Sequence, residues 1–476
     1  ETYALVLTTR LGDAYGGHVH PADGWSKIAA TGNADGPIAA ARTAYQPLLD
    51  WLDSNGTDTR ADVASAAVFT TQHTQFVVPG LKQAIDALPA PVATDVALTM
   101  PDTKPTYSLY TGMYMAPNFQ TGTVPYAGKN GGGEIKIGAD GAAIIQRTEN
   151  LRFALTVPKG KTMPVAGWPV VIYAHGTGGD YESFVDDGTG AALAAEGLAT
   201  ISMDQVLHGP RNPGGNPDLD FFNYQNPLAA RDNALQGAAD AFSQRRLIPS
   251  LAIPGDPATK FDTSAVYFFG HSQGGVTGPG FVAFEPDLKG AVLSGTAGLL
   301  TLALLAKTEP FDIPAVLNTV LDDANKDGTV DVETPSIGLV QLWMERADPI
   351  NYAPLMVMHP PGGLAPRSIY QTEGFTDHYA PNPGIEAFAT ALGGDIVMTA
   401  DEKDVEGLTK LRGRSVVAPP IMNNLNGKTA VLAQYNQAPG SDGHFVVFEV
   451  PAAEQQSAQF LGTLVSTGTA TIVIAQ

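Results

Sequence analysis

The stretch "AVYFFGHSQGG" at residues 265–275 joins an apolar run to a serine that stands between glycines. A short apolar run that ends at a glycine is typical of a buried strand. Gly270, Ser272 and Gly274 fit the pattern G-x-S-x-G, in which the serine sits on a sharp turn between a strand and a helix. The glycines leave room for the strained backbone of such a turn. The stretch predicts a serine hydroxyl presented at the end of a strand, with a tight turn without chemistry as the alternative.

Strand-like and helix-like segments alternate on both sides of this stretch. Apolar runs predict strands at 151–158, 169–176, 198–204, 265–270, 290–298 and 367–374. Helical patterns lie at 190–197 and 226–248. Buried strands that alternate with helices indicate a mostly parallel α/β sheet covered on both faces. Ligands of such folds bind at the carboxyl ends of the strands, where Ser272 is expected.

Two longer segments interrupt the alternation, near 208–225 and near 299–350. The second begins with the apolar run "LLTLALLA" at 299–306. Apolar insertions beside an active-site edge often form a cap or lid. Ordinary core helices explain the same residues equally well.

The first hundred residues differ from the rest of the chain. Residues 2–9 and 66–72 are rich in Thr, Val and aromatic residues, as strands are. Residues 87–105 are rich in proline and predict a linker. We therefore expect a small β-rich domain with its linker over 1–100 and a catalytic domain with cap insertions over 101–476.

The composition excludes several classes of function. The formal net charge is −21 over 476 residues. This acidity argues against nucleic acid as a partner, because phosphate binding needs a basic surface. The chain has no cysteine, which excludes a disulfide framework and a thiol nucleophile. No stretch approaches the length of a membrane span. The chain opens in a strand-like pattern without a signal peptide, as expected of a mature exported protein.

A nucleophilic serine needs an acidic residue to orient its base, and three carboxylates are candidates. Asp377 follows the strand-like run 368–371 and a turn at Gly374. An acid at the end of a late strand suits this role, so Asp377 is predicted as the acid. Glu373 and Asp348 are the competitors.

The base that takes the serine's proton is expected to be a histidine that follows the acid. Only His378 and His444 follow Asp377 in the sequence. His378 is adjacent to the acid, and neighbouring side chains in an extended turn generally point apart. His444 lies in a glycine-flanked loop and is therefore predicted as the base. Asp442, two residues earlier, is interpreted as a turn residue.

The oxyanion that forms during acyl transfer also needs hydrogen-bond donors. The run "VVIYAHGTGG" at 170–179 predicts a buried strand that ends in a glycine-rich turn. Such a turn can direct the backbone N–H of Thr177 at the oxyanion. The N–H of Gln273, the residue after the nucleophile, is the predicted second donor. A plain strand-to-helix turn is the alternative.

The segment "DDANKDGTVDVET" at 322–334 resembles a calcium loop of the EF-hand type. Its oxygen-bearing side chains follow the spacing of such loops, with a glycine at the sixth position. The twelfth position is a threonine, and the expected glutamate comes one residue early. We expect a structural Ca²⁺ within the cap, with an acidic surface turn as the alternative. The candidate ligands are Asp323, Asn325, Asp327, Thr329, Asp331 and Glu333.

Together these motifs resemble those of serine esterases and lipases with the α/β-hydrolase fold. The resemblance covers about 130–476: the HGTGG turn, the GHSQGG elbow, an acid after a late strand and a terminal DGH histidine. More narrowly, the chain resembles secreted bacterial lipase-like esterases that carry an Ig-like domain before the hydrolase, on the strength of "TYALVLTTRLGDAYGG" and "ASAAVFTTQ". This resemblance implies a secreted or periplasmic location, activity on carboxylic esters, no organic cofactor, and aliphatic polyesters as possible substrates.

Two other functions remain open at this point. An amidase or peptidase would use the same three residues on a different carbonyl compound. A calcium-dependent binding protein on an inactive hydrolase scaffold would retain an insoluble polymer or glycan without turning it over.

Overall fold

The computed structural model describes residues 1–12, 14–54, 57–321, 329–399 and 401–473. The chain divides into two compact units, Glu1–His73 and Thr74–Gln476. The boundary lies earlier than the linker expected near residue 100. The proline-rich region contributes the edge strand β3 (Thr94–Leu98), and the preceding helix α3 (Val77–Asp86) packs into the larger unit's core.

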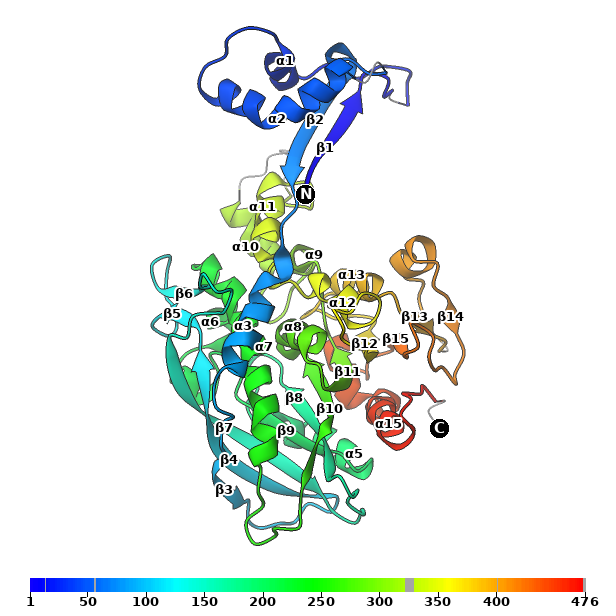
Figure 1. Cartoon of the computed structure of the whole chain (residues 1–476). Helices are drawn as coiled ribbons and strands as arrows, with labels where there is room; N and C mark the ends of the chain where they lie inside the picture. Colours follow the sequence, from blue (N-terminus) through cyan, green and yellow to red (C-terminus); the bar gives the residue numbers. More distant parts are fainter. Residues whose placement is uncertain (13, 55–56, 322–328, 400, 474–476) are drawn as a thin grey trace. The chain divides into compact units, whose positions relative to one another are not determined.

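The first unit combines one small sheet with two helices (Figure 1). Strands β1 (Thr2–Thr8) and β2 (Val63–Thr70) pair antiparallel, and α1 (Asp23–Ala29) and α2 (Gly36–Ser54) supply the rest of the small core. An Ig-like sandwich needs two packed sheets. The described part of this unit has a single two-stranded sheet, so the Ig-like domain expected here is not confirmed. The region between the two predicted strands forms α1 and α2, and their apolar residues cover the sheet. The core residues are Trp25, Leu48, Leu49, Leu52 and Val63.

An eleven-stranded sheet organises the larger unit (Figure 1). Its order is β14-β13-β15-β12-β11-β10-β8-β9-β7-β4-β3, parallel from β14 to β9 and antiparallel from β9 to β3. The predicted mostly parallel α/β sheet is thus confirmed, and it fits an α/β-hydrolase core. The strands are β3, β4 (Tyr107–Asn118), β7 (Arg147–Pro158), β8 (Trp168–Ala174), β9 (Ala199–Met203), β10 (Phe261–His271), β11 (Leu288–Ser294), β12 (Ser368–Gly374), β13 (Asp395–Val397), β14 (Val416–Val417) and β15 (Ala430–Tyr435).

Helices cover both faces of this sheet (Figure 1). Successive side chains of a strand point to opposite faces, and β10 shows this directly. Phe268 belongs to the core cluster shared with α3, α7 and α8, whereas Tyr267 and Phe269 belong to the cluster shared with α5 and α15. A small hairpin, β5 (Gln120–Gly122) with β6 (Gly132–Ile135), packs beside α7. The helices of the unit are α3, α4 (Ser183–Asp186), α5 (Thr189–Ala195), α6 (Pro217–Asp220), α7 (Pro227–Leu247), α8 (Gln273–Phe284), α9 (Leu300–Leu304), α10 (Ile313–Val320), α11 (Pro335–Met344), α12 (Ala353–Met356), α13 (Asn382–Leu392), α14 (Val446–Glu449) and α15 (Pro451–Thr467).

The connections after β8 and β10 lie at a topological switch point. The chain leaves β8, forms β9 on one side of it, and returns as β10 on the other side. The crevice at such a reversal, at the carboxyl ends of the strands, is the usual ligand site of an open α/β sheet. Both predicted cap segments also follow carboxyl ends, since 208–225 comes after β9 and 299–350 after β11. They contain the short helices α6, α9, α10 and α11.

The packing of α8 on β10 can be tested with a matched pair of glycine substitutions. A Cβ at Gly278 would lie 2.3 Å from Cε1 and Cζ of the buried Phe268 ring. We expect Gly278→Ala to lower the free energy of unfolding by about 1–3 kcal/mol, because overpacking forces core side chains to shift. The exposed Gly338 in α11 has no atom within 4 Å of an added Cβ. Gly338→Ala should stabilise by roughly 0.5–1 kcal/mol through helix propensity. Urea unfolding of both variants measures the two changes in the free energy of unfolding, which should have opposite signs. Equal changes would contradict the packing argument.

Candidate active site

Ser272 forms the turn between β10 and α8. Its backbone has φ 55° and ψ −113°, a strained conformation for a residue with a side chain. Its N–H donates to the carbonyl of Ser294 at the end of β11, at 2.9 Å. A Cβ at Gly274 would lie 2.0 Å from the carbonyl oxygen of Ala174, and one at Gly270 would lie 2.7 Å from that of Gly274. Gly274 is therefore required by the close approach of β8, and Gly270 by the close approach of the first turn of α8. The serine stays half-buried at the strand end.

His444 and Asp377 meet at the same edge of the sheet. Nδ1 of His444 lies 2.8 Å from Oδ2 of Asp377, and both side chains are buried. The other carboxylate oxygen of Asp377 accepts the N–H groups of Tyr379 at 2.9 Å and Ala380 at 2.7 Å. The carboxylate is thus held by backbone donors on one side, and it orients the imidazole on the other. This arrangement leaves Nε2 of His444 as the nitrogen that can take a proton.

The structure brings His444 to the serine turn through its neighbours. Gly295 follows Ser294, which accepts the N–H of Ser272, and a Cβ at Gly295 would lie 2.9 Å from Cε1 of His444. The imidazole of His271, the residue before the serine, lies 4.7 Å from that of His444 between ring centroids. Ser272 Oγ and His444 are not hydrogen-bonded to each other in this structure. Catalytic hydrogen bonds often tighten only with substrate present.

The competing acids have other partners. Both oxygens of Glu373 are bonded, one to Asn382 at 2.6 Å and one to Gln434 at 2.8 Å. Asp348 is fully buried and accepts the N–H groups of Leu299 at 3.0 Å and Leu300 at 2.8 Å. Burial raises the pKa of both carboxyls. Glu373 therefore braces the acid loop, and Asp348 fixes the start of the second cap segment.

Asp442 and His378 tie the histidine loop to the acid loop. One oxygen of Asp442 accepts the N–H of His444 at 2.9 Å and that of His378 at 3.2 Å. The other lies 2.6 Å from Nδ1 of His378, whose side chain is half exposed. Asp442 also begins the short 3₁₀ turn Gly443–Phe445. These contacts are those of a turn residue, as expected for Asp442.

Two backbone N–H groups near Ser272 are candidate oxyanion donors. Gln273 is the first residue of α8, so its N–H has no acceptor within the helix. In the part of the chain that the structure describes, the N–H of Thr177 also has no hydrogen-bond acceptor. The Thr177 hydroxyl donates to Oε1 of Gln273 at 3.0 Å, which links the two turns. A Cβ at Gly176 would lie 3.7 Å from Ser272 Oγ, so this turn runs directly past the serine.

Two buried neutral histidines support the glycine-rich turn. Nε2 of His208 accepts the N–H of Gly178 at 3.0 Å, while its Nδ1 bonds the carbonyl of Val206 at 2.9 Å. Nε2 of His175 likewise accepts the N–H of Gln205 at 3.0 Å. A nitrogen that accepts cannot carry a proton, so both rings are neutral. Burial lowers the pKa of His175 to about 4 and that of His208 to about 3. Both rings thus brace the glycine-rich turn and the segment after β9 through backbone N–H groups.

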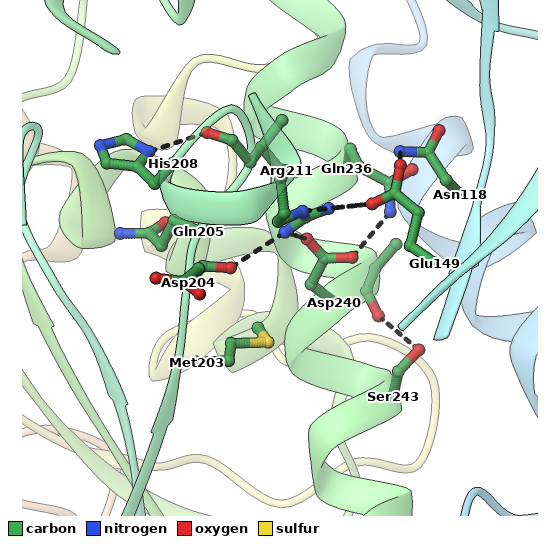
Figure 2. Close-up of polar contacts among 12 residues, drawn as sticks. Asn118, Glu149, Met203, Asp204, Gln205, His208, Arg211, Gln236, Asp240 and Ser243 are labelled. Atoms are coloured by element: carbon green, nitrogen blue, oxygen red, sulfur yellow. Dashed lines mark hydrogen bonds and ion pairs between the residues drawn. The ribbon is translucent and has the colours of Figure 1, made fainter. Parts of the chain in front are cut away.

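A buried ion network that the sequence did not reveal anchors the first cap segment (Figure 2). Arg211 donates to Asp240 on α7 at 2.6 Å and to the carbonyl of Asp204 at 3.1 Å. It also pairs with Glu149 on β7 at 3.0 Å. Its carboxylate partners raise the pKa of the Arg211 guanidinium. No local pattern marks this network, because its members are far apart in the sequence and meet only after folding.

Most of the candidate calcium loop lies outside the described residues, including Asp323, Asn325 and Asp327. Thr329, Asp331 and Glu333 are described, and one oxygen of Asp331 accepts the N–H groups of Glu333 at 2.9 Å and Thr334 at 3.0 Å. Within the described ranges, no group of three or more His, Cys, Asp or Glu side chains could hold a metal ion. Asp331 thus caps the turn before α11, and calcium binding stays a prediction.

Comparison with known proteins returns solved structures of low similarity to this chain. No protein-family model and no curated protein matches the chain. Similar solved structures include an acetyl xylan esterase from Paenibacillus sp. R4, at 15% identity and a TM-score of 0.44, over 78% of this chain and 91% of that one. Acetyl xylan esterase 1 from Thermoanaerobacterium sp. JW/SL YS485 has 11% identity and a TM-score of 0.44, over 82% and 93%. An S-formylglutathione hydrolase from Agrobacterium tumefaciens has 12% identity and a TM-score of 0.37, over 79% and 97%. At such low similarity, the function has to be inferred from the site itself.

Among the described residues, no helix combines the length and the apolar character needed to cross a membrane.

The neutral state of His208 predicts a specific acid sensitivity. Its folded pKa of about 3 lies below the value of about 6.5 for an unfolded chain, so the unfolded state binds the extra proton as the pH falls. His208→Gln keeps an acceptor near Nε2 without a titrating group. We expect the wild type to lose about 2–3 kcal/mol relative to this variant between pH 7 and pH 4.5. Denaturant unfolding across this range measures the difference between the two proteins. The His359→Gln variant, at an exposed histidine, is the control substitution.

Proposed function

We propose that the protein hydrolyses carboxylic esters through an acyl-enzyme on Ser272, with His444 as base and Asp377 as the orienting acid. The observation that carries the proposal is the buried 2.8 Å contact between His444 Nδ1 and Asp377 Oδ2, beside a serine on a strained strand-to-helix turn. Buried polar groups that converge at a strand end are typical of catalytic sites.

The reaction follows from these positions. Ser272 Oγ attacks the ester carbonyl carbon while its proton passes to Nε2 of His444. The carbon–oxygen bond to the alcohol breaks, and His444 returns that proton to the leaving oxygen. Water then attacks the acyl-enzyme, gives a proton to His444, and the acid leaves as Ser272 Oγ is reprotonated. Asp377 stabilises the imidazolium in both halves, and the N–H groups of Thr177 and Gln273 are the proposed oxyanion donors. No organic cofactor enters any step.

The serine and histidine assignments can be tested with matched substitutions. Ser272→Ala and His444→Gln should each lower kcat for a p-nitrophenyl ester by roughly 10³-fold or more, because each removes a group that the whole triad depends on. Ser264→Ala and the exposed His359→Gln are the controls, since both residues lie outside the proposed site. Circular dichroism checks that all four variants fold.

Labelling with a fluorophosphonate gives an independent readout. Peptide mass spectrometry should find the adduct on Ser272, because only an activated serine reacts. Full ester turnover in the Ser272→Ala protein would disprove the assignment. Parallel assays on ester and amide substrates separate the esterase from an amidase or peptidase.

Three finer features of the function are also proposals. Aliphatic polyesters as substrates and a secreted or periplasmic location rest on the sequence resemblance. Structural Ca²⁺ in the loop at 322–334 rests on the ligand spacing. A calcium-dependent binding protein would instead retain a polymer without product release, which the turnover assay detects.

Calcium binding has its own stability test. After chelation, Ca²⁺ should raise the free energy of unfolding by about 2.7 kcal/mol when its free concentration is about 100 times Kd. Combined Asp323→Ala and Asp327→Ala should remove this increase, whereas the exposed Asp35→Asn control should keep it. The same stability with and without Ca²⁺ would make the segment an acidic turn.

A further inference from the structure

Lys307 lies beside the candidate active site in the second cap segment. Its Nζ donates to the backbone carbonyl of Tyr379 at 2.6 Å. The same ammonium lies 5.5 Å from the ring centroid of Tyr379 and 5.9 Å from that of Phe222, which belongs to the first cap segment. The lysine side chain is only partly exposed. Residues from both cap segments and the acid loop therefore surround a single cation.

The cation has no close counter-ion. In the described chain, no carboxylate oxygen lies within 4.0 Å of Lys307 Nζ. Lys82 and Lys159, by contrast, each have an aspartate oxygen at 2.6 Å. Burial lowers the pKa of Lys307 to about 8, although Asp377, Asp218, Glu309 and Asp442 favour its charged form from a longer range. A charge that is withdrawn from water without an ion partner is costly, so an incoming anion would be stabilised here.

Its position connects this cation to the chemistry. The ring of Tyr379 stacks on the imidazole of His444, with centroids 5.0 Å apart and planes 21° from parallel. Tyr379 is also two residues after Asp377, and its N–H holds that carboxylate. Lys307 Nζ thus lies one aromatic ring away from the catalytic imidazole. An ammonium has three donors, and the carbonyl of Tyr379 takes one of them, which leaves two for a ligand.

We propose that Lys307 selects esters that carry a carboxylate, on either the acyl or the alcohol portion, placed over Tyr379. This inference rests on the proposed esterase function and names its substrate class. The net charge of −21 disfavours anionic substrates at the surface in general. A local cation between two aromatic faces gives such a substrate one specific place to bind, through a charge-assisted hydrogen bond.

The test compares esters of matched shape that differ in charge. For the acyl side, the pair is p-nitrophenyl hydrogen glutarate and p-nitrophenyl pentanoate. For the alcohol side, it is 4-acetoxybenzoate and 4-acetylphenyl acetate. The measured quantity is the ratio of kcat/KM within a pair on one enzyme sample, so the fraction of folded protein cancels. Spontaneous hydrolysis of each ester is measured without protein and subtracted.

The wild type should favour the anionic member of at least one pair. Lys307→Met should lower that ratio by roughly 10- to 100-fold, the size of a lost hydrogen bond between charged groups, and Lys307→Arg should retain most of it. Lys82→Met is the matched control, because Lys82 is also a partly buried lysine near an aromatic ring, at 5.7 Å from Phe242. Its ratio should equal that of the wild type.

Failure of the inference differs from failure of the proposed function. Ratios that Lys307→Met leaves unchanged in both pairs, while Ser272→Ala abolishes turnover, would overturn the carboxylate preference alone. Turnover of all four esters by Ser272→Ala would instead overturn the esterase mechanism. Equal loss on anionic and neutral esters in Lys307→Met would show that the lysine only supports Tyr379, and this too would overturn the preference.

Discussion

The strained backbone at Ser272 is the constraint on which the rest of the site depends. A residue with a side chain at φ 55° costs about 1–3 kcal/mol, and that cost has to be offset elsewhere. It is offset by the packing of α8 on β10 and by the hydrogen bond from the Ser272 N–H to Ser294. Both depend on parallel strands whose ends are level, because β8, β10 and β11 pair in register up to the turn. The sheet therefore positions the nucleophile before any loop contributes.

A second constraint holds the histidine loop against the acid loop. A Cβ at Gly374 would lie 2.2 Å from the carbonyl oxygen of Gly443, so the two backbones touch where no side chain could fit. The N–H of Gly443 donates to the carbonyl of Thr376 at 2.7 Å. Asp442 adds its carboxylate to the same junction. The contact between Asp377 and His444 is thus fixed by backbone packing on both sides, which preorganises the pair for catalysis without the entropy loss of ordering it with each substrate.

Local sequence patterns predicted those helices, strands and turns whose formation depends mainly on neighbouring residues. The elbow at 265–275, the helix at 226–248 and the alternation of strands and helices are present as β10–α8, α7 and the parallel sheet. The proline-rich stretch at 87–105 was interpreted as a linker, yet it contains the edge strand β3. The prolines of this stretch, at residues 89, 91, 101 and 105, all lie outside β3, so the strand itself keeps every N–H donor. The roles of Lys307 and Arg211 depend on partners far away in the sequence, so no local pattern could show them.

Helix α7 shows why such long-range polar contacts matter for the site. Its charged and amide side chains are spread around the helix rather than confined to one face, yet nearly all of them are buried. Its side chains accept backbone N–H groups of the neighbouring hairpin region: Asp232 from Ile135 at 2.7 Å and Gln236 from Phe119 at 2.8 Å. Asp240 then pairs with Arg211 in the first cap segment. Apolar side chains of the same size would pack as well and often more stably, but they could not satisfy those backbone groups. The buried polar side chains of α7 thus fix the first cap segment relative to the sheet. Their contacts determine where the sheet edge that carries Ser272 lies more than they stabilise the fold.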